Sequence, residues 1–526
     1  MFSGLQSIQR AQAQEDSSPW WKTAVFYEVF VRSFYDSDGD GVGDFDGLTQ
    51  RLDYLNDGDP TTATDLGVNA LWLMPIMPSF SYHGYDVLDY YSVDPEYGTM
   101  EDFRELLTEA HARGIRVIID LVINHTADDN PWFRASAEGA ASFGDWYVWE
   151  DQDPGWRASG DKVVWHPRGG RFYYGYFEDG MPDLNYNNPA VTAQMYDVAR
   201  FWLEEVGVDG FRLDAVKFLI EEGSTVEHAR PSREWLTAFN AHVKSINPDA
   251  FVVGEIWSNT NLVVPYVEDN AVDIAFEFDL ARTMLQSASI GRVNNLVPAI
   301  QNAVRSYPDS RFGAFLTNHD QNRAIFELRN HMERAIAAAR LLLTSPGVPF
   351  MYYGEEIGMN GRKPDERIRT PMQWEADAAT GGFTTGTPWQ PLQEDADEVN
   401  VATQADDPAS LLSAYRDLIR LRAELGLGQG LRDYVESAHR DVYSFIDMPE
   451  GAGGPAVLVI MNMYDDVLED YALSADAALP VSGSWEVVVG PEGVVPPTLS
   501  ADGAFVDYEP LPELEPYEMI ILELSQ

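Results

Sequence analysis

The stretch "VDGFRLDAVKF", residues 208–218, combines the pattern of a buried strand with three charged residues. Its apolar residues are typical of a strand that is covered on both faces, yet Arg212, Asp214 and Lys217 interrupt them. Charged side chains are almost never buried without a partner, so each of the three needs a reason to lie there. A structural salt bridge is one explanation and a functional site is the other. The rest of the sequence favours the functional site.

Similar apolar runs recur along the chain and alternate with helical patterns. One such helical stretch, "MEDFRELLTEAHARG" (100–114), carries apolar residues at the i, i+3, i+4, i+7 spacing of an amphipathic helix. The predicted strands are "AVFYEVFVRSF" (24–34), "ALWLMPI" (70–76), "IRVIIDLVINH" (115–125), "GFRLDAV" (210–216), "FVVGEIW" (251–257), "DIAFEFDL" (273–280), "GAFLTNHD" (313–320) and "PFMYYGEEIG" (349–358). Eight parallel strand–helix units predict an α/β fold, the (β/α)8 or TIM barrel, which needs about 250 residues.

Two segments of the chain depart from the barrel pattern. Residues 126–185 are rich in Trp, Tyr, Gly and Pro and are too long for a single helix, which predicts a small inserted domain after the third strand. After residue 427 short alternating strands with turn signals predict a C-terminal all-β sandwich, 428–526. The barrel then comprises 19–125 and 186–427. The polar first residues, 1–18, are expected to form a disordered N-terminal extension.

The charge balance of the chain is unusual. It has 85 acidic and 35 basic residues, a formal net charge of -50. Such an excess excludes nonspecific nucleic-acid binding, because a nucleic acid is itself a polyanion, and it disfavours an anionic membrane surface. Self-repulsion at low ionic strength destabilises a compact fold and salt screens it, so the composition predicts a salt-adapted protein; an ordinary acidic protein is the alternative.

Other features of the sequence say little about where in or outside the cell the protein is located. There is no Cys, so neither a disulfide nor thiol chemistry is expected. No run of 18 apolar residues occurs, and no membrane span is expected. "AQAQ" (11–14) loosely resembles a signal-peptidase site, although no apolar segment precedes it. We expect a secreted, extracellular protein, with a cytoplasmic one as the alternative.

Polar residues gather where the predicted strands end, which is where TIM barrels place their active sites. These residues are Asp120, Asn124, His125, Arg212, Asp214, Glu255, Asn318, His319 and Asp320. Arg212 and Asp214 are two apart in a strand and therefore share a face. Three carboxylates from different strands converge, an arrangement that glycoside hydrolysis uses: one attacks the anomeric carbon while another, held protonated, protonates the leaving oxygen. Arg212 would keep Asp214 ionised and nucleophilic.

The motifs that contain these residues carry a family resemblance. "DLVINH" (120–125), "MPDLN" (181–185), "GFRLDAVKF" (210–218), "GEIW" (254–257) and "FLTNHD" (315–320) resemble the ordered motifs of the α-amylase family, glycoside hydrolase family 13. The similarity extends over most of the chain. It implies a retaining hydrolase of α-1,4-glucosidic bonds in starch and maltooligosaccharides, with an α-glucan as its substrate and partner.

The resemblance also implies roles for individual residues. Asp214 would be the nucleophile and Glu255 the general acid/base. Asp320 would bind the hydroxyls of the distorted sugar and stabilise the oxocarbenium-like transition state. The residues expected to contact the substrate are Tyr85, Asp86, His125, Arg212, Lys217, His319 and Arg323.

The resemblance leaves several activities of the family open. Ala215 stands where α-1,6-glucosidases tend to have valine, and "SYHGYD" (81–86) and "MPDLN" (181–185) look like α-amylases intermediate between oligo-1,6-glucosidases and neopullulanases. We therefore expect an endo-acting, monomeric α-amylase. The alternatives are an exo-acting α-glucosidase, a transglycosylase or trehalose synthase, and a non-catalytic scaffold relative, which would lack the three carboxylates.

The stretch "DSDGDGVGD" (36–44) is a candidate calcium loop, because alternate aspartates supply hard oxygen ligands. Gly47 stands where an EF-hand has its last glutamate. The stretch resembles instead the first-loop calcium site of oligo-1,6-glucosidase-like relatives, which implies as ligands Asp36, Asp38, Asp40, the Val42 carbonyl and Asp44. A solvated acidic turn is the alternative. Phe218 replaces a histidine whose carbonyl helps to bind the family's shared calcium, so a second site at Asn124 stays open.

Overall fold

The computed structural model of the protein describes residues 18–223, 225–448, 455–476, 479–481 and 483–525. The predicted N-terminal extension, apart from Ser18, lies outside the described residues.

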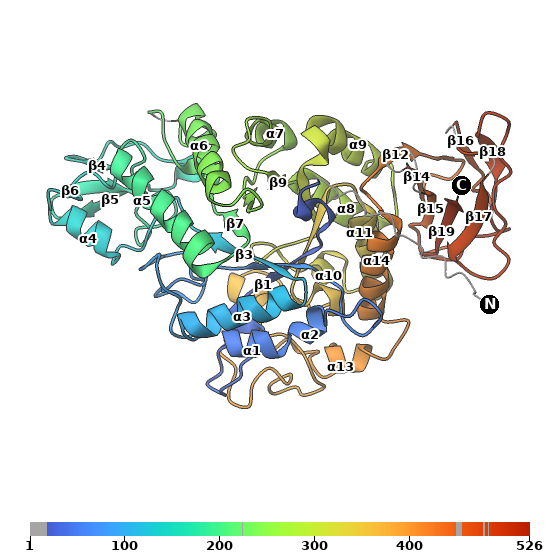
Figure 1. Cartoon of the computed structure of the whole chain (residues 1–526), viewed down its shortest axis with the longest axis horizontal. Coiled ribbons are helices and arrows are strands. Elements are labelled where there is room, and N and C mark those ends of the chain that lie inside the picture. Colours follow the sequence, from blue (N-terminus) through green and yellow to red (C-terminus); the bar gives the residue numbers. More distant parts are fainter. Residues whose placement is uncertain (1–17, 224, 449–454, 477–478, 482, 526) are drawn as a thin grey trace, which may run out of the picture.

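Eight parallel strands close into a barrel, which confirms the predicted fold (Figure 1). Around the barrel the strands follow the order β1-β11-β10-β9-β8-β7-β3-β2. They are β1 (Phe26–Val29), β2 (Ala70–Leu73), β3 (Arg116–Leu121), β7 (Gly210–Leu213), β8 (Phe251–Gly254), β9 (Ile274–Phe276), β10 (Phe312–Phe315) and β11 (Val348–Tyr352). Each strand lies within or beside one of the predicted apolar runs. Almost all of their residues are buried, as expected where helices cover the outside and side chains fill the inside.

Helices alternate with the strands of the barrel, and the longer ones surround it (Figure 1). They are α1 (Phe45–Gln50), α2 (Leu52–Leu55), α3 (Met100–Ala112), α5 (Pro189–Arg200), α6 (Arg230–Ile246), α7 (Thr260–Glu268), α8 (Phe278–Ile290), α9 (Leu296–Ser306), α10 (Ala324–Glu327), α11 (Met332–Thr344), α12 (Asp365–Ile368), α13 (Val401–Gln404) and α14 (Leu411–Leu425). Helix α3 has the predicted amphipathic form, and Thr99 begins it with a capping box that includes Asp102. Among the described residues, no helix combines the length and the apolar character that crossing a bilayer requires.

Aromatic side chains fill the inside of the barrel. The rings of Phe26 and Phe350 stack with centroids 4.4 Å apart, and Phe276 packs against both Phe350 and Trp72. Trp72 in turn contacts the edge of His319, with centroids 5.6 Å apart. The barrel is therefore a packed core rather than a channel. Its aromatic layer packs directly beneath the polar residues at the strand ends, as the contact of Trp72 with His319 shows.

The segment between β3 and β7 forms a small sheet of its own. It contains α4 (Pro131–Ala137), β4 (Trp149–Glu150), β5 (Trp165–Arg168) and β6 (Arg171–Tyr174). The strands are antiparallel in the order β4-β6-β5. The boundaries of the inserted domain, 126–185, stay a prediction.

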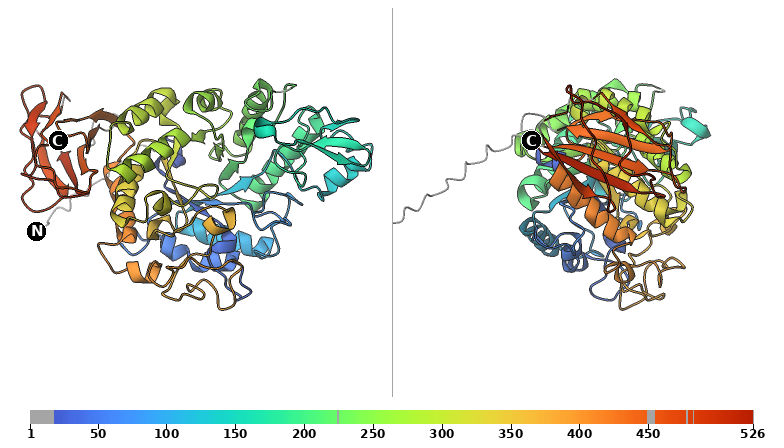
Figure 2. Two further views of the ribbon diagram at one scale, coloured as in Figure 1. Left: turned by 180° about the vertical axis from the view of Figure 1, so that it is seen from behind. Right: turned by 90° about the vertical axis from the view of Figure 1, so that its right-hand side faces the viewer.

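Antiparallel sheets follow the barrel, as predicted. The five-stranded sheet has the order β12-β14-β15-β19-β17 and the three-stranded sheet has the order β13-β16-β18. Their strands are β12 (Leu431–Tyr434), β13 (Glu436–Ser437), β14 (Val442–Met448), β15 (Ala456–Asn462), β16 (Leu473–Ala475), β17 (Ser484–Val489), β18 (Phe505–Tyr508) and β19 (Met519–Ser525). These sheets and the β4-β6-β5 sheet lie at opposite ends of the molecule (Figures 1 and 2).

Candidate active site

Arg212 lies at the centre of the cluster of charged residues and pairs with two carboxylates. Its side chain is 1% exposed. Its Nη1 donates to both oxygens of Asp120, each at 3.0 Å, and to Oδ1 of Asp214 at 2.6 Å. The parallel register of β3 and β7 sets Asp120 beside Arg212. Arg212 and Asp214 of the apolar stretch therefore satisfy one another, and their salt bridge lies within the candidate functional site.

The backbone turns sharply after Asp214 and links it to Glu255. Ala215 adopts a left-handed conformation with φ of 53°, which costs an L-residue about 1–2 kcal/mol. In this conformation its N–H donates to Oε2 of Glu255 at 3.1 Å. Burial raises the pKa of Glu255, although the positive charge of Arg212 partly opposes the rise. Glu255 therefore keeps its proton to a higher pH than an exposed glutamate, as a general acid must.

Asp320 has the opposite electrostatic environment. Nη2 of Arg369 donates to its Oδ1 at 2.9 Å, and Nε2 of His319 lies 3.5 Å from its Oδ2. Burial alone would raise the pKa of Asp320, but His319, Arg369 and Arg212 outweigh it and lower the pKa to about 2. Two carboxyl groups of one site, Asp320 and Glu255, are thus tuned in opposite directions, which separates acid from anion.

Tyr85 and His319 connect these groups. The Tyr85 hydroxyl donates to Oδ2 of Asp120 at 3.1 Å and lies 2.7 Å from Nε2 of His319. The two rings are stacked, with centroids 5.7 Å apart and an interplanar angle of 19°. On its other side, Nδ1 of His319 lies 2.5 Å from Oε1 of Glu28. The orientation of Tyr85 is therefore determined by β3 and by His319 together.

His125 and Lys217 present polar atoms from two neighbouring strand ends. Burial lowers the pKa of His125, which favours the neutral form of its imidazole. Among the described residues its buried Nε2 has no hydrogen-bond partner, which leaves it available to a ligand hydroxyl. Nζ of Lys217 donates to Oε2 of Glu227 at 2.9 Å and to the Trp257 carbonyl at 3.0 Å.

Asp86 and Arg323 have partners outside this cluster. Oδ1 of Asp86 accepts from the Ser79 hydroxyl at 2.5 Å. The guanidinium of Arg323 is buried and donates to the backbone carbonyls of Ile368, at 3.0 Å, and Tyr353, at 2.5 Å. Among the described residues, neither side chain bonds to another predicted site residue. Arg323 links the end of α12 to the residue after β11, and its contact with substrate stays a prediction.

Three residues of the site were not predicted as functional. Asp120 was noted only as a polar residue at a strand end. Glu28 is a carboxylate inside an apolar strand run, and this is the same signal that singled out Arg212. Arg369 lies in an irregular segment, where neither periodicity nor a motif marks it. Its partner, Asp320, is 49 residues away in the sequence.

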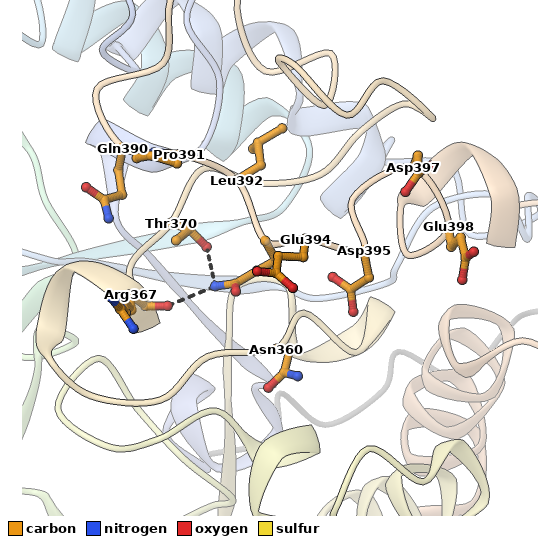
Figure 3. Close-up of a pocket in the computed structure, with 11 residues that line it drawn as sticks. Asn360, Arg367, Thr370, Gln390, Pro391, Leu392, Glu394, Asp395, Asp397 and Glu398 are labelled. Carbon is orange, nitrogen blue, oxygen red and sulfur yellow. Dashed lines mark hydrogen bonds between the residues drawn. The ribbon is translucent and has the colours of Figure 1, made fainter.

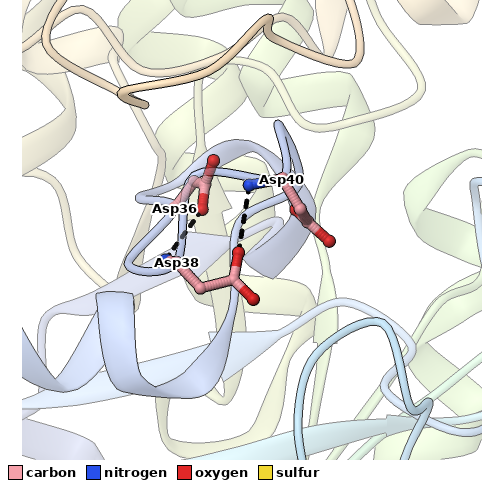
Figure 4. A group of neighbouring side chains, drawn as sticks. All are labelled: Asp36, Asp38 and Asp40. Carbon is pink, nitrogen blue, oxygen red and sulfur yellow. Dashed lines mark hydrogen bonds between the residues drawn. The ribbon is translucent and has the colours of Figure 1, made fainter.

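The predicted calcium loop brings its aspartates together. Carboxylate oxygens of Asp36, Asp38 and Asp40 all lie within 4.8 Å of one another (Figure 4). The N–H of Val42 donates to Oδ1 of Asp40 at 2.8 Å. Asp44 begins helix α1, and its two carboxylate oxygens accept backbone N–H groups at 2.6 and 2.8 Å. A cluster of hard oxygen donors fits Ca²⁺.

A separate cleft of about 730 Å³ adjoins the segment that carries Arg369 (Figure 3). Thr370 and the acidic Glu394 and Asp395 are among the residues that line it. Nε2 of Gln393 donates to the Arg367 carbonyl at 2.9 Å across one side of it. None of the three predicted catalytic carboxylates lines this cleft, so it is distinct from the site at the strand ends.

Comparison with known proteins agrees with this geometry. A family model described as alpha amylase, catalytic domain, matches residues 28–429. Alpha-amylase 3 of Dictyoglomus thermophilum is 38% identical over 435 residues, which cover 82% of this chain and 83% of that protein. Trehalose synthase of Pimelobacter sp. is 34% identical over 525 residues, which cover 87% of this chain and 89% of that protein.

The solved structures give the same result. The crystal structure of the alpha-amylase from H. orenii superposes with a TM-score of 0.84 at 37% identity and covers 96% of this chain and 100% of that one. The family model spans all four strand ends that carry the candidate site. The chain is therefore a member of the alpha-amylase family of glycoside hydrolases, family 13.

Proposed function

We propose that the protein hydrolyses α-1,4-glucosidic bonds of starch and maltooligosaccharides with retention of configuration. The observation that carries the proposal is the contrast between Asp214, which Arg212 contacts at 2.6 Å, and Glu255, whose pKa burial raises. A carboxylate paired with a buried cation stays ionised and can attack carbon. A carboxyl group with a raised pKa keeps its proton to a higher pH and can deliver it to the leaving oxygen.

The two steps follow from these roles. Oδ of Asp214 attacks the anomeric carbon, the bond from that carbon to the glycosidic oxygen breaks, and Glu255 gives its proton to the departing oxygen. Glu255, now a carboxylate, takes a proton from water. The water oxygen attacks the anomeric carbon, the ester bond to Asp214 breaks, and the enzyme returns to its initial state.

The other residues of the cluster would hold the sugar in the site. Asp320, ionised at neutral pH, accepts hydrogen bonds from ring hydroxyls and stabilises positive charge that develops on the sugar. Nε2 of His125 is available to a further hydroxyl. The ring of Tyr85, fixed by Asp120 and His319, is placed to stack on the sugar face.

The products formed from soluble starch test this proposal, with Asp214→Asn as the inactive control. A rapid loss of iodine staining with mixed maltooligosaccharides supports endo-acting hydrolysis, whereas glucose alone with slow loss of staining indicates exo-action. Full activity of Asp214→Asn would refute the assignment of the nucleophile.

A second candidate is the transfer of the same covalent intermediate to a sugar, because the chain is also 34% identical to a trehalose synthase. Conversion of maltose into trehalose, with no action on starch, would favour this isomerase over the hydrolase.

For the loop 36–44 we propose structural calcium binding by Asp36, Asp38, Asp40, the Val42 carbonyl and Asp44. Asp36 also ties this loop to a distant segment, since its backbone N–H donates to the Phe383 carbonyl at 3.0 Å. A bound cation would offset the repulsion among the aspartates and so hold the two segments together.

We also propose adaptation to salt, on the support of the net charge of -50. Counter-ions that screen this charge would remove a repulsion that acts against the compact state. Secretion and a monomeric state remain predictions.

A further inference from the structure

A chain of hydrogen bonds runs from the first barrel strand to the nucleophile. Its links join Oε1 of Glu28 to Nδ1 of His319 (2.5 Å), Nε2 of His319 to the Tyr85 hydroxyl (2.7 Å), that hydroxyl to Asp120 (3.1 Å), Asp120 to Arg212 (3.0 Å) and Arg212 to Asp214 (2.6 Å). Glu28 and His319 are 1% and 0% exposed, so water does not compete for their contact. Glu28, the first residue of this series of hydrogen bonds, has no role in the two proposed steps of hydrolysis.

The positions of the protons along this chain follow from its donors. Arg212 can only donate, and it donates to both oxygens of Asp120, which in its ionised form only accepts. The single hydroxyl proton of Tyr85 therefore points to Asp120, and the Tyr85 oxygen accepts from Nε2–H of His319. Nδ1 of His319 faces the carboxylate of Glu28 and must also carry a proton. Both ring nitrogens are donors only in the imidazolium form.

The surroundings of the imidazole agree with a positive charge. The groups that face it are Glu28 from β1, Trp72 from β2, Tyr85 from the loop after β2, Asp120 from β3, Asp320 beside it in the chain and Arg369 from the segment after α12. Burial alone would lower the pKa of His319, but Asp320 and Glu28 outweigh burial and the opposing Arg369, and the pKa is raised. Asp320 is also paired with Arg369 at 2.9 Å, whereas the carboxylate of Glu28 contacts the imidazole ring of His319 directly.

We propose that Glu28 is a positioning residue that holds His319 as an imidazolium with both N–H groups donating. This inference rests on the proposed function, because it assigns a purpose to the charge of His319 in that site. Without Glu28 the ring would lose a proton, and Nε2 would become an acceptor. The site would then lose a donor for a sugar hydroxyl beside Asp320, and the Tyr85 hydroxyl would be drawn away from Asp120.

The substitution Glu28→Gln tests the proposal, because glutamine keeps the size and an acceptor oxygen but removes the charge. The first measurement is the titration of His319 by NMR on protein with ¹³C-labelled histidine, with the signal assigned by its loss in His319→Gln. We expect the titration midpoint to fall by about 1–2 pH units. This readout needs no substrate, so it decides the inference even if the protein does not cleave starch.

The second measurement is the pH profile of kcat/KM on maltooligosaccharides. Glu28→Gln should approach the wild type near pH 5 and fall about tenfold below it at pH 8, because a shift of one pH unit changes the charged fraction up to tenfold. The matched control is Glu277→Gln. Glu277 is also buried and accepts from the hydroxyls of Thr260 (2.8 Å) and Tyr307 (2.6 Å), away from His319. Its substitution should leave both readouts unchanged.

The opposite results would overturn the proposal. An unchanged His319 titration in Glu28→Gln, or a loss of kcat/KM by the same factor at every pH, would show that Glu28 only fills space. If Glu28→Gln does not fold, Glu28→Asp replaces it. That variant keeps the charge, so its His319 must titrate within about half a pH unit of the wild type; a fall of a full unit refutes the proposal.

Discussion

Replacing Arg212 with methionine should cause one of the largest losses of stability that a single substitution can produce in this protein. Methionine has a similar length and no charge, so the change leaves Asp120 and Asp214 without their shared cation. Asp120 is completely buried, and burial already raises its pKa to about 7 despite the attraction of Arg212. Without that attraction the carboxyl group must take up a proton or remain an unpaired buried charge.

The magnitude follows from this geometry. Breaking a buried ion pair by removing one partner costs about 3–5 kcal/mol, because the remaining charge is no longer compensated. Three short hydrogen bonds, at 3.0, 3.0 and 2.6 Å, are lost together. The free energy of unfolding, measured by urea denaturation at pH 7 with its midpoint and slope, should fall by that amount.

A surface arginine provides the matched control. Arg116 pairs with Asp209 at 2.8 Å, but its side chain is 50% exposed. Arg116→Met should therefore cost less than about 1 kcal/mol. The double variant Arg212→Met/Asp120→Asn should regain part of the loss, because it also removes an unpaired charge. If Arg212→Met were no less stable than Arg116→Met, the reasoning that these buried charges depend on one another would be wrong.

Three further predictions concern protonation, metal binding and salt. Burial raises the pKa of Glu255 and its acid form is the active one, so kcat/KM of the wild type should fall as the pH rises through that raised pKa. Glu255→Gln should lower kcat/KM at least about 100-fold. Wild-type activity in Glu255→Gln would contradict the role of Glu255 as the acid. A chelator should lower the melting temperature of the wild type but not that of Asp38→Asn. Asp59→Asn, a substitution in another exposed loop, is the control and should still respond to the chelator. Calcium at 100 times its Kd raises the free energy of unfolding by about 2.7 kcal/mol. The melting temperature should rise between dilute buffer and molar NaCl, and equal stability in both would remove the proposal of salt adaptation.

Much of the fold was predictable because its signals are local. Each barrel strand is buried on both faces, so its apolar run is visible without knowledge of its neighbours. The pairing of Asp214 with Arg212 was predictable for the same reason, since residues two apart on a strand share a face. The order of strands with polar ends then predicted that Asp214, Glu255 and Asp320 share one site.

The contacts that set the protonation of the site could not be predicted in this way. Glu28 is bonded to His319, which is 291 residues away, and Arg369 reaches Asp320 from an irregular segment. Arg323 was also predicted to contact substrate; its guanidinium donates to backbone carbonyls in this fold, and the contact with substrate stays a prediction.

The sequence by itself determined the barrel, because strand periodicity and apolar runs depend on neighbouring residues, and its motifs determined the family. Only the tertiary structure decided which carboxyl group keeps its proton. The pKa of Glu255, Asp320 or Asp120 depends on how deeply the fold buries each group and on which charge it brings within a few ångströms. Closing a barrel brings together strands that are hundreds of residues apart, and no local pattern records that distance.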